Sequence, residues 1–186
     1  MKNNMIFNEY TFDNFVVGES NKFACDMVLA VAEETINPHY NPLYIYSKSG
    51  LGKTHLLHAV RQRVEEKYPD RKVIYVRSDD FAEEFALSKK EDKRDEFRNK
   101  YSSLDVLLID DVQNLAGKPA VQHELLSIYN TLREKGAQII IASDKSLTEL
   151  HGVTDTLRTR FIGLPIEIHP PDTDALRGER KKGRCN

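Results

Sequence analysis

The sequence has few of the features that mark secreted, metal-binding or membrane proteins. Its 186 residues include no tryptophan and only two cysteines, Cys25 and Cys185, which form no closely spaced pair and no metal-binding pattern. Both are therefore predicted to be free thiols, which suits a reducing cytoplasm. No apolar run approaches the roughly 20 residues of a membrane span, and the first residues lack the apolar stretch of a signal peptide. We predict a cytoplasmic protein with no membrane span.

The sequence also lacks a large excess of either positive or negative charge. The formal net charge is -2, so the overall charge of the chain does not attract it to nucleic acid. Any such contact requires a local basic patch. Hydrophobic residues make up 40% of the chain, which is enough for one sizeable core. The composition changes near residue 172, and Arg177–Arg184 is basic without an apolar period. We expect one domain over residues 1–172 and a disordered tail over 173–186, with nucleic-acid binding by the tail as the alternative.

Five short apolar runs alternate with longer amphipathic segments. The runs are Leu43–Tyr46, Val73–Val76, Val106–Ile109, Ile139–Ala142 and Leu164–Ile168. Apolar residues at helical spacing predict helices over Lys53–Lys67 and Pro119–Leu132. Strands that alternate with helices predict right-handed crossovers and a parallel sheet with helices on both faces. The predicted fold is therefore α/β, with three layers and five parallel strands.

The segment Phe81–Tyr101 departs from this alternation. It carries the mixed-charge run Lys89–Glu96 between two apolar patches. A run of this kind is most often a solvated surface. We therefore predict two helices in this segment, joined by a turn that is exposed to solvent.

The most informative motif follows the first predicted strand. Residues Ser47–Thr54 match the P-loop pattern G-x-x-x-x-G-K-[ST], except that Ser47 replaces the first glycine. The backbone N–H groups of Ser49–Thr54 and the start of the next helix favour a phosphate chain. Lys53 would reach the β and γ phosphates, and the Thr54 hydroxyl would bind Mg²⁺. An ordinary glycine turn is the alternative, and the Lys-Thr pair argues against it.

Polar residues follow two more strands at the same predicted edge of the sheet. Asp110 and Asp111 follow the third apolar run, and Ser143 and Asp144 follow the fourth. One carboxylate can hold the metal and a second can orient or deprotonate an attacking water. Helix or loop caps are the alternatives for both pairs. Arg160 lies between the last two strands, where it is either surface charge or an arginine finger for a neighbouring subunit.

These residues resemble the AAA+ ATPase domain of the bacterial chromosomal replication initiator DnaA, from about Asn8 to Asp172. The matching motifs are Tyr10–Asn21, Asn41–Tyr46, Gly50–His55, Phe97–Tyr101, Asp105–Gln113, Leu115–Lys118, Ala142–Asp144 and Leu157–Phe161. Motifs of this length, in this order, are far more specific than a P-loop alone.

The resemblance implies the strand order 5-1-4-3-2 and a role for each site residue. Asp110 is then the metal aspartate and Asp111 the catalytic acidic residue, while Asp144 takes the first sensor position. Arg160 matches the arginine finger that reads ATP on the adjacent protomer. The implied ATP and Mg²⁺ contacts are Val17, Asn21, Ser49, Gly50, Leu51, Gly52, Lys53, Thr54 and His55, with Thr54 and Asp110 on the metal.

The resemblance also implies partners and an activity. A DnaA-type domain binds and slowly hydrolyses ATP as a switch, assembles with other initiator protomers and acts in chromosome replication at the origin. Its contacts with single-stranded origin DNA would fall near Ala86 and Lys118. We expect this DNA contact to be weak, because Ala120 occupies the partner position two residues after Lys118.

Several features depart from the family pattern. Ser47 costs roughly 1–3 kcal/mol if its position requires a left-handed backbone, and little if it merely ends the strand. Thr156 replaces a basic residue, and no helical lid follows Asp172. We therefore expect a truncated form with impaired ATP binding. The alternatives are a nucleotide-poor regulatory module or remnant that docks onto full-length initiator, and a small-molecule P-loop kinase, which leaves Arg160 unexplained.

Overall fold

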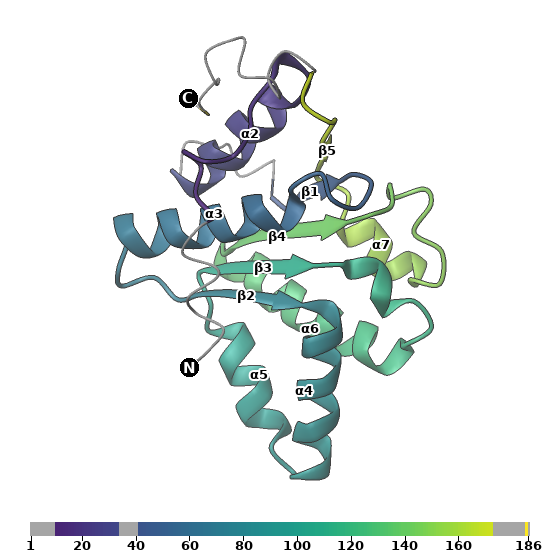
Figure 1. The fold of residues 1–186 in the computed structure, drawn as a ribbon. Helices are drawn as coiled ribbons and strands as arrows, with labels where there is room; N and C mark the ends of the chain where they lie inside the picture. The colour runs from purple at the N-terminus through teal and green to yellow at the C-terminus, as the bar shows by residue number, and fades with distance from the viewer. Residues whose placement is uncertain (1–9, 34–40, 173–184, 186) are drawn as a thin grey trace.

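Residues 10–33, 41–172 and 185 are described by the computed structural model, and their strands form one parallel sheet (Figure 1). The strands are β1 (Leu43–Tyr46), β2 (Val73–Arg77), β3 (Val106–Asp110), β4 (Gln138–Ser143) and β5 (Leu164–Glu167). They pair in the order β2-β3-β4-β1-β5, and every pair is parallel. This is the predicted order read from the opposite edge, so both the fold class and the topology are confirmed.

Helices cover both faces of the sheet. They are α2 (Glu19–Ala32), α3 (Lys53–Lys67), α4 (Ser78–Lys90), α5 (Arg94–Ser102), α6 (Pro119–Lys135) and α7 (Asp155–Arg160), with the 3₁₀ helix η2 at Val112–Leu115. The side chains of Leu43 and Leu108 pack with α2 and α3 on one face. Those of Tyr44 and Leu107 pack with α4 to α7 on the other, because successive strand residues point to opposite faces. No helix in the described part of the chain is long and apolar enough to cross a membrane.

The α4–α5 hairpin projects from the β2 edge of the sheet (Figure 1). The rings of Phe81 and Tyr101 hold the two helices together, with their centroids 5.0 Å apart. The turn at residues 91–93 is exposed, as the charged run predicts. A two-pronged ion pair joins Arg98 of α5 to Glu124 of α6, whose side chain is only 2% exposed. The hydrogen bonds from Arg98, helped by its charge, lower the pKa of Glu124 although burial opposes this, so the carboxylate stays ionised.

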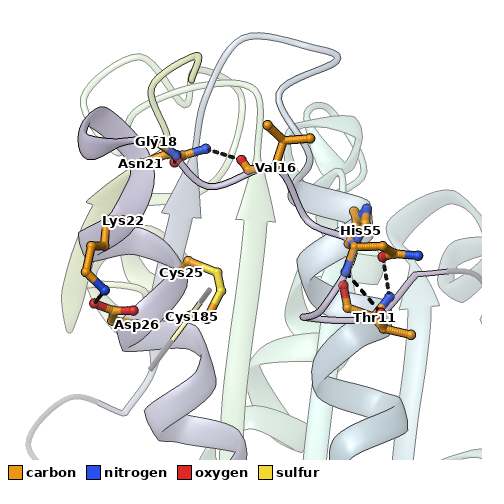
Figure 2. The surroundings of a disulfide bond; sticks show 10 residues. Thr11, Val16, Gly18, Asn21, Lys22, Cys25, Asp26, His55 and Cys185 are labelled. Carbon is orange, nitrogen blue, oxygen red and sulfur yellow. Dashed lines mark hydrogen bonds and ion pairs between the residues drawn. A yellow bond between two sulfur atoms is a disulfide. The ribbon is translucent and has the colours of Figure 1, made fainter. Parts of the chain in front are cut away.

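Cys25 and Cys185 form a disulfide, so the prediction of two free thiols is wrong (Figure 2). Their Cα atoms are 5.5 Å apart, within the range that a disulfide allows, although 160 residues separate them in the sequence. Sequence spacing could not reveal this pair, because disulfide formation depends on proximity in the fold. The cysteines therefore give no support for a reducing compartment. The rest of the predicted tail, residues 173–184 and 186, lies outside the described residues.

The segment before α2 packs against the loop that precedes α3. Phe15 is buried there, and a Cβ atom added to Gly52 would lie 2.5 Å from the edge of its ring. Gly52 also has φ +95°, in the left-handed region. Gly50 has φ +83°, but a Cβ atom added to it would meet nothing within 4 Å. The two glycines therefore share a backbone requirement, and only Gly52 has a packing requirement as well.

We expect Gly52→Ala to destabilise the fold more than Gly50→Ala. Both substitutions cost roughly 1 kcal/mol for a left-handed alanine, but only Gly52→Ala forces Phe15 to move, which adds about 1–3 kcal/mol. Urea unfolding of the two variants measures the difference. A Gly52→Ala, Phe15→Leu double variant should recover part of the loss. Equal destabilisation by both alanines would contradict the packing role of Phe15.

His58 is a buried titratable residue of α3 with 3% of its surface exposed. Its ring centroid lies 4.0 Å from that of Tyr75 and 5.9 Å from that of Tyr10. Burial lowers the pKa of His58 to about 4, helped by the positive charge of Arg61. His58 is therefore neutral in the folded protein at neutral pH.

This pKa predicts that the fold loses stability on mild acidification. The unfolded chain binds a proton at His58 near its ordinary pKa of about 6.5, whereas the folded chain does so only near 4. The contribution of neutral His58 to stability is therefore fully present above about pH 6.5. It is lost as the pH falls from about 6.5 to about 4. We expect the melting temperature to fall less between pH 6.5 and 5 in His58→Phe than in the wild type. The exposed His123→Gln is the control, and parallel curves for all three proteins would exclude His58 as the cause.

Candidate functional site

The predicted phosphate and metal residues meet at one edge of the sheet. β1, β4 and β3 are neighbours in the sheet and run parallel, so their carboxyl ends lie at the same edge. The loop 47–54 follows β1, Asp110 ends β3, and Ser143 ends β4. Because parallel strands bring these ends together, residues almost 100 positions apart in the sequence share one site.

Ser47 continues the strand pairing of β1. Its backbone N–H donates a hydrogen bond to the Ser143 carbonyl at 3.2 Å, and its hydroxyl donates to the Lys48 carbonyl at 3.1 Å. Among the described non-glycine residues, only Asp92 and Asp111 have positive φ, so the Ser47 backbone is not left-handed. The serine therefore ends the strand without the backbone cost that a glycine-only position would impose.

Lys53 is the buried cation of the site, with 7% of its surface exposed. Its ammonium donates hydrogen bonds to the carbonyl oxygens of Ser47 at 2.8 Å and Lys48 at 3.2 Å. Burial lowers the pKa of Lys53, and the charges of Asp110 and Asp111 oppose this effect. A cation held by carbonyls of its own loop can exchange these contacts for phosphate oxygens, which are stronger partners.

Asp110 is buried and accepts hydrogen bonds on both carboxylate oxygens. Thr54 Oγ1 and the Tyr75 hydroxyl donate to Oδ2 at 2.6 and 3.0 Å, and the Asp111 N–H donates to Oδ1 at 2.9 Å. Carboxylate and hydroxyl oxygens suit Mg²⁺, which takes few protein ligands and completes its shell with phosphates and water. In the described part of the chain, no group of three or more His, Cys, Asp or Glu side chains could hold a metal ion. Thr54 and Asp110 together fit a magnesium site.

Asp111 is held in a strained conformation directly after β3. Its φ is +55°, a value that is uncommon outside glycine. The Ser78 hydroxyl donates to its carbonyl oxygen at 2.5 Å, which fixes the backbone. On the carboxylate, Gln113 Nε2 donates to Oδ1 at 3.1 Å and a guanidinium nitrogen of Arg77 lies 3.5 Å from Oδ2. Strain of this kind is typical of functional sites.

Gln113 also reaches the end of β4. Its Oε1 accepts hydrogen bonds from the Ser143 hydroxyl at 3.1 Å and the Asp144 N–H at 3.2 Å. The Asp144 carboxylate lies beside this amide, and its buried Oδ1 has no hydrogen-bond partner in the described part of the chain. Asp144 thus offers an unused acceptor at the predicted sensor position.

Sequence reasoning assigned no role to Tyr75 or Gln113. Tyr75 counts as one apolar residue in a strand pattern, although a tyrosine in a buried strand usually directs its hydroxyl to a partner. Gln113 lies three residues after the end of β3, and nothing in the sequence says that η2 turns its amide back to Asp111. Both contacts depend on the tertiary fold.

Two of the predicted ATP contacts, Asn21 and His55, tie the N-terminal segment to itself and to α3 (Figure 2). Asn21 Oδ1 accepts from the Gly18 N–H at 2.8 Å, and its Nδ2 donates to the Val16 carbonyl at 3.0 Å. His55 Nε2 lies 2.8 Å from the Thr11 carbonyl oxygen, so it joins this segment to the start of α3. Burial lowers the pKa of His55. These side chains shape the wall of the site through contacts within the protein.

The other predicted ATP contacts lie in the same two segments. Val17 is buried in the core beneath α2 and α3, and Leu51 packs against that core. Ser49 and Gly50 are exposed, which leaves their backbone N–H groups accessible to a ligand.

Arg160 is not part of this cluster. It is exposed at the end of α7, and its carbonyl oxygen accepts a hydrogen bond from the Tyr129 hydroxyl at 2.7 Å. Within the described residues its guanidinium makes no ion pair. An arginine presented in this way is available to another chain.

The predicted DNA residues lie beside the α4–α5 hairpin. Ala86 is exposed on α4. Lys118 begins α6, and its ammonium pairs with Asp79 Oδ1 at 2.8 Å. Asn114 donates to the other oxygen of Asp79 at 2.7 Å. The hydrogen bond from Lys118 lowers the pKa of Asp79. Lys118, the residue predicted to contact a DNA phosphate, thus already has a carboxylate partner.

Solved structures of DnaA proteins are similar to this chain over most of its length. Domain III of the Thermotoga maritima replication initiation protein DnaA is 46% identical with a TM-score of 0.85, over 90% of this chain and 70% of that one. DnaA from Aquifex aeolicus bound to AMPPCP is 45% identical with a TM-score of 0.80. A replication initiator DnaA bound to AMPPCP and single-stranded DNA is 43% identical with a TM-score of 0.81. The last two matches cover 87% of this chain and half of each relative.

The family comparison agrees with the structural one. The family described as the bacterial DnaA ATPase domain matches residues 6–167, which include every site residue considered above. The match therefore extends from the segment before α2 to the end of β5, through all five strands. The chain belongs to the bacterial DnaA ATPase domain family.

Proposed function

We propose that residues 1–172 form an ATP-dependent switch of the DnaA type, which acts in the initiation of chromosome replication. The observation that carries this proposal is the convergence of Lys53, Thr54 with Asp110, and Asp144 at one sheet edge in a chain of this family. Relatives that are 43% and 45% identical bind the ATP analogue AMPPCP, which supports ATP as the ligand.

The geometry suggests how ATP would be held and hydrolysed. Lys53 would exchange its loop carbonyls for the β and γ phosphates, and Thr54 and Asp110 would hold Mg²⁺, which neutralises phosphate charge when bound. Asp144 Oδ1 would orient a water molecule at the γ phosphorus. As the water oxygen bonds to that phosphorus, its proton passes to Asp111. The bond to the bridging oxygen breaks, and ADP leaves with the electron pair.

We further propose that Arg160 acts between protomers. Its guanidinium makes no contact with its own site in the described residues, and it lies on a surface helix beside the exposed Ile162. An arginine supplied by a second copy would neutralise charge on the transferred phosphoryl group. The ATP site would then be complete only in an assembly of two or more copies.

A nucleotide-poor regulatory module is the second candidate function. Ser47 favoured it at the level of the sequence, because a serine in a left-handed position would weaken the loop. The backbone of Ser47 is not left-handed, and its carbonyl holds Lys53, so this residue gives no reason to prefer the second candidate.

ATP binding and hydrolysis should separate in two variants. Lys53→Ala removes a charge-assisted contact and should weaken ATP retention by roughly 10- to 100-fold in a filter-binding assay with Mg²⁺. Asp111→Asn should keep retention and slow hydrolysis by about 100-fold or more, since it removes the proton acceptor. Lys48→Ala, an exposed lysine of the same loop, is the control and should bind ATP normally. Equal, weak retention by the wild type and Lys53→Ala would instead favour the regulatory module.

We also propose weak binding of single-stranded DNA around Ala86 and Lys118. A relative that is 43% identical binds single-stranded DNA, and Lys118 is a cation of the kind that contacts phosphates. In this chain a phosphate must compete with Asp79 for the lysine, because the two form an ion pair. This competition would weaken DNA binding further, in addition to the effect expected from Ala120.

This competition predicts opposite effects of two substitutions on DNA affinity. Lys118→Ala should weaken binding of an oligo-dT probe a few-fold and lower its salt dependence by about one phosphate contact. Asp79→Asn should strengthen binding a few-fold, because an exposed ion pair is worth only about 0.2–1 kcal/mol. Lys93→Ala, in the exposed turn of the hairpin, is the control. If Lys118→Ala weakens binding and Asp79→Asn has no effect, the lysine binds DNA without competition from Asp79.

A further inference from the structure

We propose that Gln113 is a positioning residue for ATP hydrolysis, which orients the Asp111 carboxylate and ties it to the end of β4. This proposal rests on the proposed ATPase function. Gln113 makes three hydrogen bonds to two strand ends: one to Asp111 Oδ1, one from the Ser143 hydroxyl and one from the Asp144 N–H. No other described side chain joins the predicted catalytic carboxylate, Asp111, to the predicted sensor, Asp144.

The orientation of the Gln113 amide follows from its partners. The Asp144 N–H can only donate, so the amide atom beside it must be the oxygen. The Ser143 hydroxyl accepts a bond from the Lys145 N–H, which leaves its own proton for the same amide oxygen. The amide NH₂ group therefore faces Asp111, whose ionised carboxylate can only accept. Every donor and acceptor in this group agrees with one arrangement.

Hydrogen bonds fix both the backbone and one carboxylate oxygen of Asp111. Its φ is +55°, which is uncommon for a non-glycine residue, and the Ser78 hydroxyl donates to its carbonyl oxygen. Gln113 fixes one carboxylate oxygen, Oδ1. The other oxygen, Oδ2, lies 3.5 Å from Arg77 in a pair whose arginine is half exposed, and such pairs are weak. Gln113 thus leaves Oδ2 as the oxygen that can take a proton from water.

The same hydrogen bonds continue to the phosphate-binding loop. The Ser143 carbonyl accepts the Ser47 N–H, and the Ser47 carbonyl accepts the Lys53 ammonium. A continuous chain of contacts therefore runs from Lys53 through Ser47, Ser143 and Gln113 to Asp111. Gln113 is the one link in it that contacts the carboxylate directly.

Gln122 provides a matched control for a test of this role. It is a buried glutamine of α6 with the same number of hydrogen bonds: its Nε2 donates to the Leu115 and Gly152 carbonyls, and its Oε1 accepts the Thr154 N–H. None of these partners belongs to the candidate site. Gln122→Met and Gln113→Met therefore remove the same number of hydrogen bonds, and only the second removes a contact with Asp111.

The experiment measures the single-turnover hydrolysis rate, ATP affinity and melting temperature of each variant. We expect Gln113→Met to slow hydrolysis by about 10- to 100-fold, because a carboxylate displaced by about 1 Å loses that much rate, with ATP affinity unchanged within about twofold. Gln122→Met should lower the melting temperature and leave the hydrolysis rate of the folded protein unchanged. Gln113→Glu keeps the acceptor for Ser143 and Asp144 but replaces the donor to Asp111 with a carboxylate oxygen that repels it, so it should be at least as slow as Gln113→Met.

Three outcomes would overturn the proposal. Wild-type hydrolysis rates in both Gln113 variants would show that Asp111 needs no such support. Parallel losses of rate, affinity and melting temperature in Gln113→Met and Gln122→Met would show a purely structural role. Asp111→Asn, measured alongside, tests the proposed function separately. If this variant hydrolyses ATP at the wild-type rate, Asp111 is not the proton acceptor, and the role proposed for Gln113 fails with it.

Discussion

The parallel pairing of β1, β4 and β3 is the constraint on which the candidate site depends. Backbone hydrogen bonds fix the register of these strands, for example Ile45 beside Ala142 and Ile109 beside Ile141. Their side chains are buried on both faces, so a shift of one residue would exchange the two cores and is strongly disfavoured. The strand ends are thereby held within hydrogen-bonding distance, and short side chains such as Thr54 and Ser143 are long enough to complete the site.

Sequence reasoning was strong where a local pattern specifies the answer. All five strands lie within two residues of the predicted apolar runs, and α3 has the predicted bounds, because continuous apolar runs and helical spacing report burial directly. The positions of loop 47–54 and Asp110 at strand ends were predicted in the same way, and their roles in ATP and metal binding stay predictions. The charged turn between α4 and α5 was also correct.

It failed where the answer depends on contacts between distant segments. The disulfide joins residues 160 positions apart, and Gln113 and Tyr75 acquire their roles only when η2 and β2 fold beside Asp110 and Asp111. Ser47 is a further case, because the sequence shows that a glycine is missing and cannot show whether the backbone there is left-handed. Lys118 was identified as a basic residue, but its partner Asp79 lies on another helix.

The ion pair between Arg98 and the buried Glu124 has a consequence for ligand binding by the α4–α5 hairpin. It joins α5 to α6. The aromatic rings between α4 and α5 join α4, the helix that contains Ala86, to α5. The hairpin and α6 are thus joined by contacts within the protein. A surface that is ordered before binding loses little conformational entropy on binding. The proposed affinity of this surface for single-stranded DNA would then be set mainly by its charges, and ionic strength would be the variable that controls it most directly.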